Sequence, residues 1–378
     1  MRPEVVAACA LSAVPGLGGS SLGRIAAEFQ TLQGAAERGP QAILERADIL
    51  KLRPRARAYL AKAPDLRELG LWALEAARKA GARVLLLGDD DYPLQLRKID
   101  NPPALLYLRG HLQREARRIA VVGSREADEE GLEIASRMGE DFARAGSQVV
   151  SGGARGIDAA AHEGALSASG STVAVLGCGI DVVYPAENGE LFDRIASGGG
   201  AVVTGFAPGT PPTQKNFPQR NRTISGLSDA VVVVRAALKS GALITADHAA
   251  LQRRPIFAVP GDHELAAGPN ELLRRQKATA ARCAFDVLQG LHWPIPDGLS
   301  APPSREAREK ATPKPIADPD VDGESLQLWR LLDDRKPAHL DDLALRTQIP
   351  SQVALRKLAD LELKGLAVQR PGKYFLRR

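Results

Sequence analysis

Four short segments of the chain combine glycine, hydroxyl, amide and basic residues in the manner of phosphate-binding loops. They cover 120–125, 150–158, 217–222 and 239–245. The candidate ligand-binding residues in them are Ser124, Arg125, Ser151, Gly152, Gly153, Arg155, Gly156, Phe217, Arg220, Asn221, Arg222, Lys239, Ser240 and Thr245. Glycine lets backbone N–H groups approach a phosphate closely, and a helix N-terminus adds a favourable dipole, so these segments favour anionic ligands.

The number of such segments bears on the kind of ligand. A mononucleotide or dinucleotide site is typically centred on one glycine-rich loop, whereas four segments along one edge of a sheet suit a run of phosphates. Phe217 is available to stack a base, which is worth about 1–3 kcal/mol, although a core position is an equally ordinary place for a phenylalanine. The pattern therefore indicates a polyanion with accessible bases.

The catalytic motifs that accompany phosphate loops do not occur in the sequence. No GxxxxGK followed by Ser or Thr is found, so ATP hydrolysis on a P-loop is not expected. Gly152, Gly153 and Gly156 do not make GxGxxG, and the following strand ends without an acidic ribose ligand, which disfavours a dinucleotide site. We expect a protein that is not an enzyme and carries no cofactor.

A few titratable residues still need an interpretation. Asp158 and His162 lie one turn apart on a predicted helix, where they are either an acid–base or metal pair or, more simply, a helix start with a dipole-compensating carboxylate. The adjacent residues Asp262 and His263 are expected to be structural. Cys178 follows a strand, but a lone thiol without an identified base is a weak nucleophile candidate. No metal site is expected.

The elements that must position these segments show a regular alternation between residues 71 and 293. Apolar, β-branched runs occur at 119–123, 149–151, 172–176, 201–204, 230–234 and 256–259. The stretches 131–144, 157–167 and 242–252 are long enough for crossover helices. Such alternation predicts a doubly wound, Rossmann-like α/β domain with a parallel sheet, whose ligand lies beyond the carboxyl ends of the strands.

Residues 1–70 are expected to form a small helical domain of the helix-hairpin-helix or SAM-like kind. The loop 14–18 between two helical runs contains two glycines. It is either a hairpin whose N–H groups meet phosphates or a plain helical turn. Arg53, Arg55 and Arg57 belong either to a phosphate-facing surface or to an ordinary solvated face.

The C-terminal part shows a linker and a second small domain. Prolines punctuate the charged stretch 294–323, which predicts an extended linker. Helical runs at 325–332, 340–347 and 351–364, followed by a strand pair at 366–370 and 374–376, predict a winged helix over 324–378. Winged helices bind duplex DNA or another protein, and the pattern does not choose between them.

The bulk composition sets broader limits. The net charge of +5 permits binding to a polyanion but does not establish it. Three cysteines without CxxC spacing argue against a disulfide framework or a zinc site. No signal peptide and no apolar run near the roughly 18 residues of a membrane span are recognised, so a cytoplasmic protein is expected.

At these segments the sequence resembles the DprA/Smf family of DNA-processing proteins. The matching runs are 121–125, 151–162, 177–185, 217–222, 239–246 and 257–261, and they occur in family order. The helical and winged-helix flanks also resemble family members that carry both.

The resemblance implies a homodimer that binds single-stranded DNA, protects it and loads the RecA recombinase onto it during natural transformation or recombinational repair. Single-strand-binding protein is a further implied partner. The resemblance places in the DNA groove Arg125, the 151–156 loop, Phe217, Arg220, Asn221, Arg222 and Lys239, with Lys215 nearby.

The chain departs from the family pattern at two places. The run 274–277 reads Arg-Arg-Gln-Lys where a small Gly-Ala pair is usual, which puts the end of the central domain in doubt. The strand at 201–204 continues as Thr204, Gly205 and Phe206 where Ser-Glu is more usual, so a negative charge is missing there.

Two other classes of protein compete with this interpretation. Rossmann-like nucleoside-monophosphate phosphoribohydrolases also use glycine loops near phosphates, but resemble a Pro-Gly-Gly-x-Gly-Thr-x-x-Glu signature whose glutamate is missing here. A winged-helix transcription regulator would explain the tail and leave the large central domain without a role.

Overall fold

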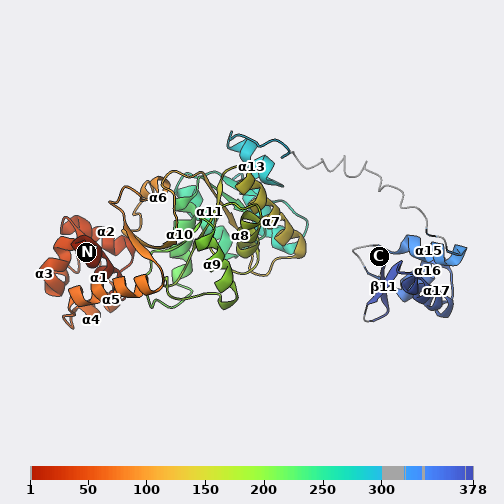
Figure 1. Cartoon of the computed structure of the whole chain (residues 1–378), viewed down its shortest axis with the longest axis horizontal. Coiled ribbons are helices and arrows are strands. Elements are labelled where there is room, and N and C mark those ends of the chain that lie inside the picture. Colours follow the sequence, from red (N-terminus) through yellow and green to blue (C-terminus); the bar gives the residue numbers. More distant parts are fainter. Residues whose placement is uncertain (1, 300–318, 320, 334–336, 371, 378) are drawn as a thin grey trace. The chain divides into compact units, whose positions relative to one another are not determined.

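The computed structural model of the chain describes residues 2–299, 319, 321–333, 337–370 and 372–377. They belong to two compact units, Met1–Pro302 and Pro303–Arg378, and each unit has a hydrophobic core of its own (Figure 1). The linker predicted over 294–323 falls largely outside the described residues. None of the described helices combines the length and the apolarity that crossing a bilayer requires.

A mixed sheet forms the centre of the larger unit, with the strand order β1-β2-β6-β5-β4-β3-β7-β8-β9. The strands are β1 (Arg83–Leu86), β2 (Leu105–Gly110), β3 (Arg118–Val122), β4 (Gln148–Ser151), β5 (Thr172–Val175), β6 (Ala201–Thr204), β7 (Ala230–Val233), β8 (Ile256–Ala258) and β9 (Thr279–Ala280). Across the sheet from β6 through β5, β4, β3, β7 and β8 to β9, each strand is parallel to its neighbours. β2 is antiparallel to both β1 and β6.

Helices cover both faces of the parallel strands, which is why these strands are apolar on both sides. In β3, Ile119 and Val121 enter one core, while Ala120 and Val122 enter the other. The first face carries α7 (Glu129–Arg144), α8 (Ile157–Ser167) and α13 (Ala284–Gly290), and the second carries α6 (Leu94–Arg97), α10 (Asn216–Leu227), α11 (Gly241–Leu251) and α12 (Ala267–Arg274). The predicted doubly wound, Rossmann-like domain is confirmed.

The strand order reverses at β3, which lies between β4 and β7. The chain builds β3, β4, β5 and β6 in one direction across the sheet and then β7 and β8 in the other. Crossing loops leave a crevice at such a switch point, outside the carboxyl ends of the strands. The loops that follow β3, β4 and β5 therefore meet at one edge.

The N-terminal helices are α1 (Pro3–Ala13), α2 (Gly19–Glu28), α3 (Leu32–Glu45), α4 (Pro54–Leu60) and α5 (Leu66–Lys79). The helical region runs through the predicted boundary at residue 70, because Asp65 caps α5 and the helix continues for fourteen residues. Leu11 and Ile25 share one core with Tyr107 and Leu176 of the sheet. The helices thus pack directly onto one end of the sheet (Figure 1).

The antiparallel strands β1 and β2 are elements that the sequence patterns did not predict. Both are short, and β2 pairs with β6, almost a hundred residues further along the chain. Such a pairing leaves little trace in local periodicity. The remaining short elements of this unit are η1 (Ala186–Asn188), α9 (Gly189–Ser197) and η2 (Glu264–Ala266).

The unusual basic run 274–277 lies at the end of α12. Arg274 and Arg275 both pair with Glu271, at 2.7 and 2.6 Å, so much of the added charge is balanced locally. The chain then continues into β9 and α13, whose residues Ala284, Val287 and Leu288 are buried in the core. The central domain therefore extends through α13.

The second unit contains α15 (Gly323–Leu331), β10 (Ala338–His339), α16 (Leu340–Thr347), α17 (Ser351–Leu363), β11 (Ala367–Arg370) and β12 (Tyr374–Arg377). The three strands are antiparallel in the order β10-β12-β11. Leu328, Leu343, Leu358 and Phe375 are fully buried between helices and sheet. The predicted winged helix is confirmed.

Candidate nucleic-acid interface

A cavity of about 250 Å³ opens at the carboxyl edge of the sheet, where the loops after β3, β4 and β5 meet α10. Five residues predicted from the sequence line it, namely Arg125, Gly152, Arg155, Phe217 and Arg220. The structure thus brings together three segments that are spread over about a hundred residues of the chain. The rest of the lining is Glu126, Ala154, Gly177, Tyr184 and Pro185.

The ring of Phe217 is the centre of this cavity. The guanidinium carbon of Arg125 lies 5.0 Å from the ring centroid and that of Arg220 lies 5.6 Å away. Tyr184 stacks beside it, with centroids 5.9 Å apart and planes 29° apart. Cations near aromatic faces are attracted by the ring quadrupole, and the same surface can receive a nucleobase. A side chain at Gly177 would collide with the ring, since a Cβ there would stand 2.7 Å from Phe217 Cδ1.

The glycine-rich loop after β4 is held from inside by Asp158. Its carboxylate accepts hydrogen bonds from the N–H groups of Gly152 and Ala154, at 3.1 and 3.3 Å. Gly156 has φ +71, and a Cβ there would overlap the backbone oxygen of Ser124. Two of the N–H groups expected to face a phosphate therefore already donate to Asp158. The loop forms part of the cavity wall, and Arg155 is its charged side chain there.

Arg220 is almost fully buried, with 6% of its surface exposed. It donates to the carbonyl oxygens of Gly152 and Val175 and, at 3.0 Å, to the side-chain oxygen of Asn221. Burial lowers the pKa of Arg220, and the nearby Asp158 carboxylate opposes that effect. This guanidinium holds the glycine loop in place and presents only a small part of itself to the cavity.

Four predicted ligand residues, Ser151, Gly153, Asn221 and Thr245, are buried within the fold. The Ser151 hydroxyl donates to the carbonyl of Val121 at 2.6 Å. The Asn221 amide donates to the carbonyl of Gly241 at 3.0 Å. Thr245 is 1% exposed on α11, and Gly153 is also buried. Their positions support the loops from below and do not offer these polar groups to a ligand.

The remaining predicted residues lie around the cavity and not in its wall. Lys239 is exposed in the loop before α11, and Ser240 caps that helix by accepting from the N–H of Ala242. The Ser124 hydroxyl accepts from the N–H of Glu126 at 3.1 Å. Lys215 and Arg222 line a larger neighbouring cleft, which Arg220 also touches.

Two residues of the site had no role in the sequence analysis. Tyr184 supplies the second ring, and Glu187 forms an ion pair with Arg155 at the rim. Tyr184 lies in the run 177–185 that resembles the family. The sequence did not show that this side chain is exposed beside Phe217. Surface exposure of a loop tyrosine has no signature in local sequence.

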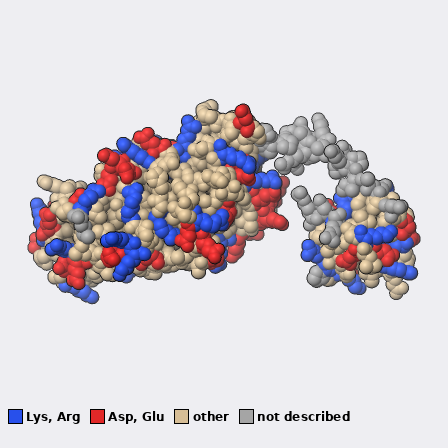
Figure 2. Space-filling model, in the orientation of Figure 1, with Lys and Arg blue, Asp and Glu red and all other residues tan. Residues whose placement is uncertain are grey.

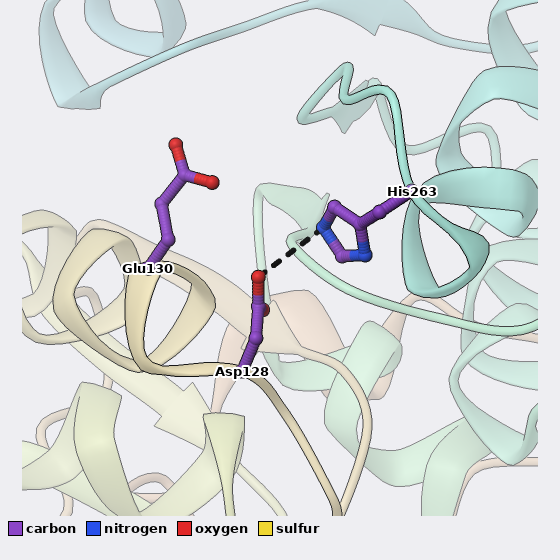
Figure 3. A group of neighbouring side chains, drawn as sticks. All are labelled: Asp128, Glu130 and His263. Atoms are coloured by element: carbon purple, nitrogen blue, oxygen red, sulfur yellow. Dashed lines mark ion pairs between the residues drawn. The ribbon is translucent and has the colours of Figure 1, made fainter. Parts of the chain in front are cut away.

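Asp128, Glu130 and His263 lie close together, and all three are residue types that are able to bind a metal ion (Figure 3). The buried Arg235 guanidinium donates to both carboxylates, at 3.0 Å each. His263 Nε2 lies 3.3 Å from Asp128, whose carboxylate also caps α7 through the N–H of Gly131. The negative charge of the group is thus balanced by an arginine, which favours a structural role, as expected for His263.

Asp158 and His162 do not form an acid–base pair. The Thr172 hydroxyl donates to the carbonyl of Val149, so it accepts from Nδ1 of His162, 2.7 Å away. Burial lowers the pKa of His162 to about 3, which leaves the ring neutral. Burial also raises the pKa of the Cys178 thiol to about 11, which disfavours the nucleophilic thiolate.

Basic and acidic side chains are interspersed on the visible face of the larger unit (Figure 2). The mild net charge of +5 is therefore not concentrated into one continuous patch on this face. Recognition of a polyanion depends on where cations face a concave surface without acidic neighbours.

Most of the chain matches known protein families. Residues 83–292 match the family model described as DNA recombination-mediator protein A, and residues 311–373 match the DprA winged helix domain. Protein Smf of Synechocystis is 32% identical over 81% of this chain and 82% of its own length. DNA processing protein DprA of Bacillus subtilis is 37% identical over 58% of this chain and 74% of its own length.

Two solved structures share the fold. DNA processing protein A from Streptococcus pneumoniae superposes with a TM-score of 0.59 and 28% identity, covering 76% of this chain and 98% of that chain. The same protein from Helicobacter pylori, described by its single-stranded DNA binding mode, gives a TM-score of 0.51 and 27% identity over 56% of this chain and 97% of its own.

Proposed function

The chain belongs to the DNA recombination-mediator protein A family, and on that premise we propose that it binds single-stranded DNA along the carboxyl edge of its sheet and acts as a recombination mediator. The observation that carries the proposal is the Phe217 ring between the guanidinium groups of Arg125 and Arg220. It joins a stacking surface to positive charge in one cavity.

Each part of this cavity suits a different part of a nucleotide. Arg125 is exposed and is able to contact phosphate, while Phe217 and Tyr184 offer their rings to an unstacked base. Lys239 lies outside the cavity, where it suits a phosphate further along the strand. In a duplex the bases are stacked on one another, so the rings gain little from double-stranded DNA. A preference for single strands follows.

The titratable groups support binding without chemistry on the DNA. Asp158 is occupied by the loop N–H groups, and His162 is buried and neutral. A phosphoribohydrolase would need a carboxylate free to act at the sugar, and Glu126 is the acidic residue of the cavity lining that such an enzyme would have to use. Release of free base from nucleoside monophosphates by the purified chain would contradict the proposal and favour that enzyme class.

The partners proposed for this activity are RecA, single-strand-binding protein and a second copy of the chain. A mediator of this kind is expected to speed RecA assembly on a strand already covered by single-strand-binding protein. RecA filament assembly on such a strand, with and without the chain, measures this directly. Light scattering coupled to gel filtration reports whether the chain is the proposed homodimer.

The central test is a binding titration with single- and double-stranded oligonucleotides at several salt concentrations. We expect tighter binding to the single strand and a linear fall of log affinity with log salt, by about 0.7 per phosphate contact. Arg125→Ala combined with Lys239→Ala should weaken binding and flatten the slope. The matched control is Arg137→Ala combined with Arg144→Ala, on the exposed side of α7. Equal affinity for both DNA forms would contradict the proposal.

A further inference from the structure

A second, larger hollow lies where the N-terminal helices meet the sheet. It is a cleft of about 1380 Å³. One wall is formed by residues 12–22, Arg24, Arg53, Arg55 and Trp72 of the helical region. The other is formed by residues 205–211, 213–216, 218–220 and 222–223 and by the ends of β2 and β5. Both walls belong to one compact unit with a shared core.

The charge of this cleft is one-sided. Six basic side chains line it, namely Arg24, Arg53, Arg55, Lys215, Arg220 and Arg222. Among the described residues of its lining, none is Asp or Glu, although the whole chain has 45 of them. Asp100, outside the lining, is the acidic residue whose charge acts on Arg222. A concave surface of one sign concentrates an oppositely charged ligand.

Several of these cations are free for a ligand. Arg53, Arg55 and Lys215 are exposed, and their side chains make no ion pair or hydrogen bond with any residue that the structure describes. Arg222 is half-buried, and burial lowers its pKa while the charge of Asp100 opposes that effect. Arg24 is held by the neutral carbonyl of Leu50. The cleft therefore lacks its own anion.

The loop between α1 and α2 adds hydrogen-bond donors to the same wall. The N–H groups of Gly18 and Gly19 have no acceptor among the described residues, and they stand at the N-terminus of α2. Gly18 packs against the side chain of Gln219 on α10, so the loop is fixed beside the sheet. Trp72, 52% exposed, and Phe206 supply rings.

The cleft adjoins the first cavity, because the Arg220 side chain lines both. Resting on the proposed function, we propose that a single strand bound at Phe217 continues past Arg220 into this cleft, and that the N-terminal helices form the second wall of the DNA path. Arg53, Arg55 and Lys215 contact successive phosphates there, and Trp72 stacks on a base.

A single strand fits the cleft better than a duplex does. The cations lie on facing walls of a hollow and the rings lie among them, an arrangement that suits a flexible backbone with splayed bases. A duplex is a convex rod whose bases are not available for stacking, and it would meet only the rim. An acidic peptide would satisfy the charge and the free N–H groups, but it has no bases to stack on Trp72.

The residue that tests the charge argument is Gly205, at the end of β6 in the wall of the cleft. A Cβ built on Gly205 meets other atoms only at 3.8 Å, so a side chain fits without distortion. Gly205→Glu places a carboxylate where the lining has none. We expect Gly205→Glu to weaken binding of a long strand at least tenfold. Gly205→Gln introduces a side chain of the same shape without the charge, and it should bind within about threefold of the natural chain.

The second test removes two of the cations from the helical wall. Arg53→Ala combined with Arg55→Ala in the full chain should weaken binding of an oligonucleotide of about 30 nucleotides about tenfold and flatten its salt slope by about 1.4. Binding of an oligonucleotide of about 6 nucleotides, which we expect to be held chiefly at Phe217, should be unchanged. The matched control is Arg67→Ala combined with Arg78→Ala, two exposed arginines of α5 outside the cleft.

The outcomes separate this inference from the function on which it rests. Long-strand binding that is unaffected by Arg53→Ala with Arg55→Ala and by Gly205→Glu overturns the path through the cleft and leaves the first cavity intact. An equal loss for short and long strands also overturns it, because the cleft would then not be an extension. If the natural chain binds neither length, both proposals fail together.

Discussion

At the scale of single residues, the first cavity depends on one ring. Phe217 has an arginine near it on α10 and another from the loop after β3, and Tyr184 lies alongside. Arg220 is so enclosed that its main contribution is to the loop geometry, whereas Phe217 is accessible to a base. The energetic contribution of the ring is therefore separable from that of the scaffold.

We predict that Phe217→Ala weakens single-strand binding by about 1–3 kcal/mol, roughly 5- to 150-fold, because one base loses its stacking partner. Phe217→Tyr keeps the ring and should bind within a few-fold of the natural chain. Fluorescence anisotropy with a labelled oligonucleotide measures both variants. If Phe217→Ala and Phe217→Tyr weaken binding equally, stacking on the aromatic ring does not explain the affinity.

A second residue-scale prediction concerns pH. His162 is held neutral in the fold with a pKa of about 3, whereas in the unfolded chain it takes up a proton near its ordinary value of about 6.5. Between these values the unfolded state binds the extra proton, so the free energy of unfolding falls on acidification, by up to about 1.4 kcal/mol per pH unit.

Urea denaturation at a series of pH values between 7 and 4 checks this prediction. His162→Gln cannot take up that proton, so its stability should decline less steeply over the same range. Parallel curves for the natural chain and the variant would show that His162 is not the group responsible for the acid sensitivity.

At the scale of elements, the sequence predicted most of the sheet, because each parallel strand from β3 to β8 is a short apolar run bounded by turn residues. α8 and β6 matched their predicted limits to the residue, and the other predicted strands and helices of the sheet domain differ by only one or two residues at an end. The pairing of β2 with β1 and β6 could not be predicted, since β6 lies almost a hundred residues further along the chain. The extension of the helical region to Lys79 was hidden for the same reason, because the packing of α5 on α1 is a tertiary contact.

The site itself was predicted in part. Glycine, arginine and phenylalanine at strand ends predicted a site at the carboxyl edge of the sheet, and five of the named residues line the cavity that lies there. The sequence did not reveal which of these side chains form hydrogen bonds within the protein. Ser151 and Asn221 have the right chemistry for a ligand, but each donates to a buried carbonyl. The one-sided charge of the larger cleft emerges only when residues from both walls are brought together.

The glycine loop allows an element-scale prediction. Gly156→Ala should destabilise the fold and weaken DNA binding, because it combines a left-handed backbone with overlap against the backbone of Ser124. Gly146→Ala is the matched control, since Gly146 also has positive φ, +70, but meets nothing within 4 Å. Chemical denaturation should show the larger loss for Gly156→Ala. Equal losses would mean that backbone conformation alone matters.

At the scale of the whole molecule, the chain contains two units with separate cores. We predict that a chain ending at residue 302 folds and binds single-stranded oligonucleotides with the affinity of the full chain, because both hollows lie in the larger unit. Circular dichroism and a binding titration check the two parts of this statement. A large loss of affinity in a folded, shortened chain would assign the winged helix a part in single-strand binding.

The core that the N-terminal helices share with the sheet has a consequence for how the larger unit melts. Leu11 and Ile25 cannot leave their places without exposing Tyr107 and Leu176, so the helices and the sheet should unfold as one cooperative block in a calorimeter. The two walls of the wide cleft are then rigidly preassembled before any strand arrives. Capture of the strand does not have to order the backbone of the protein, so the entropy lost on binding falls on the DNA and on the arginine and lysine side chains that contact it.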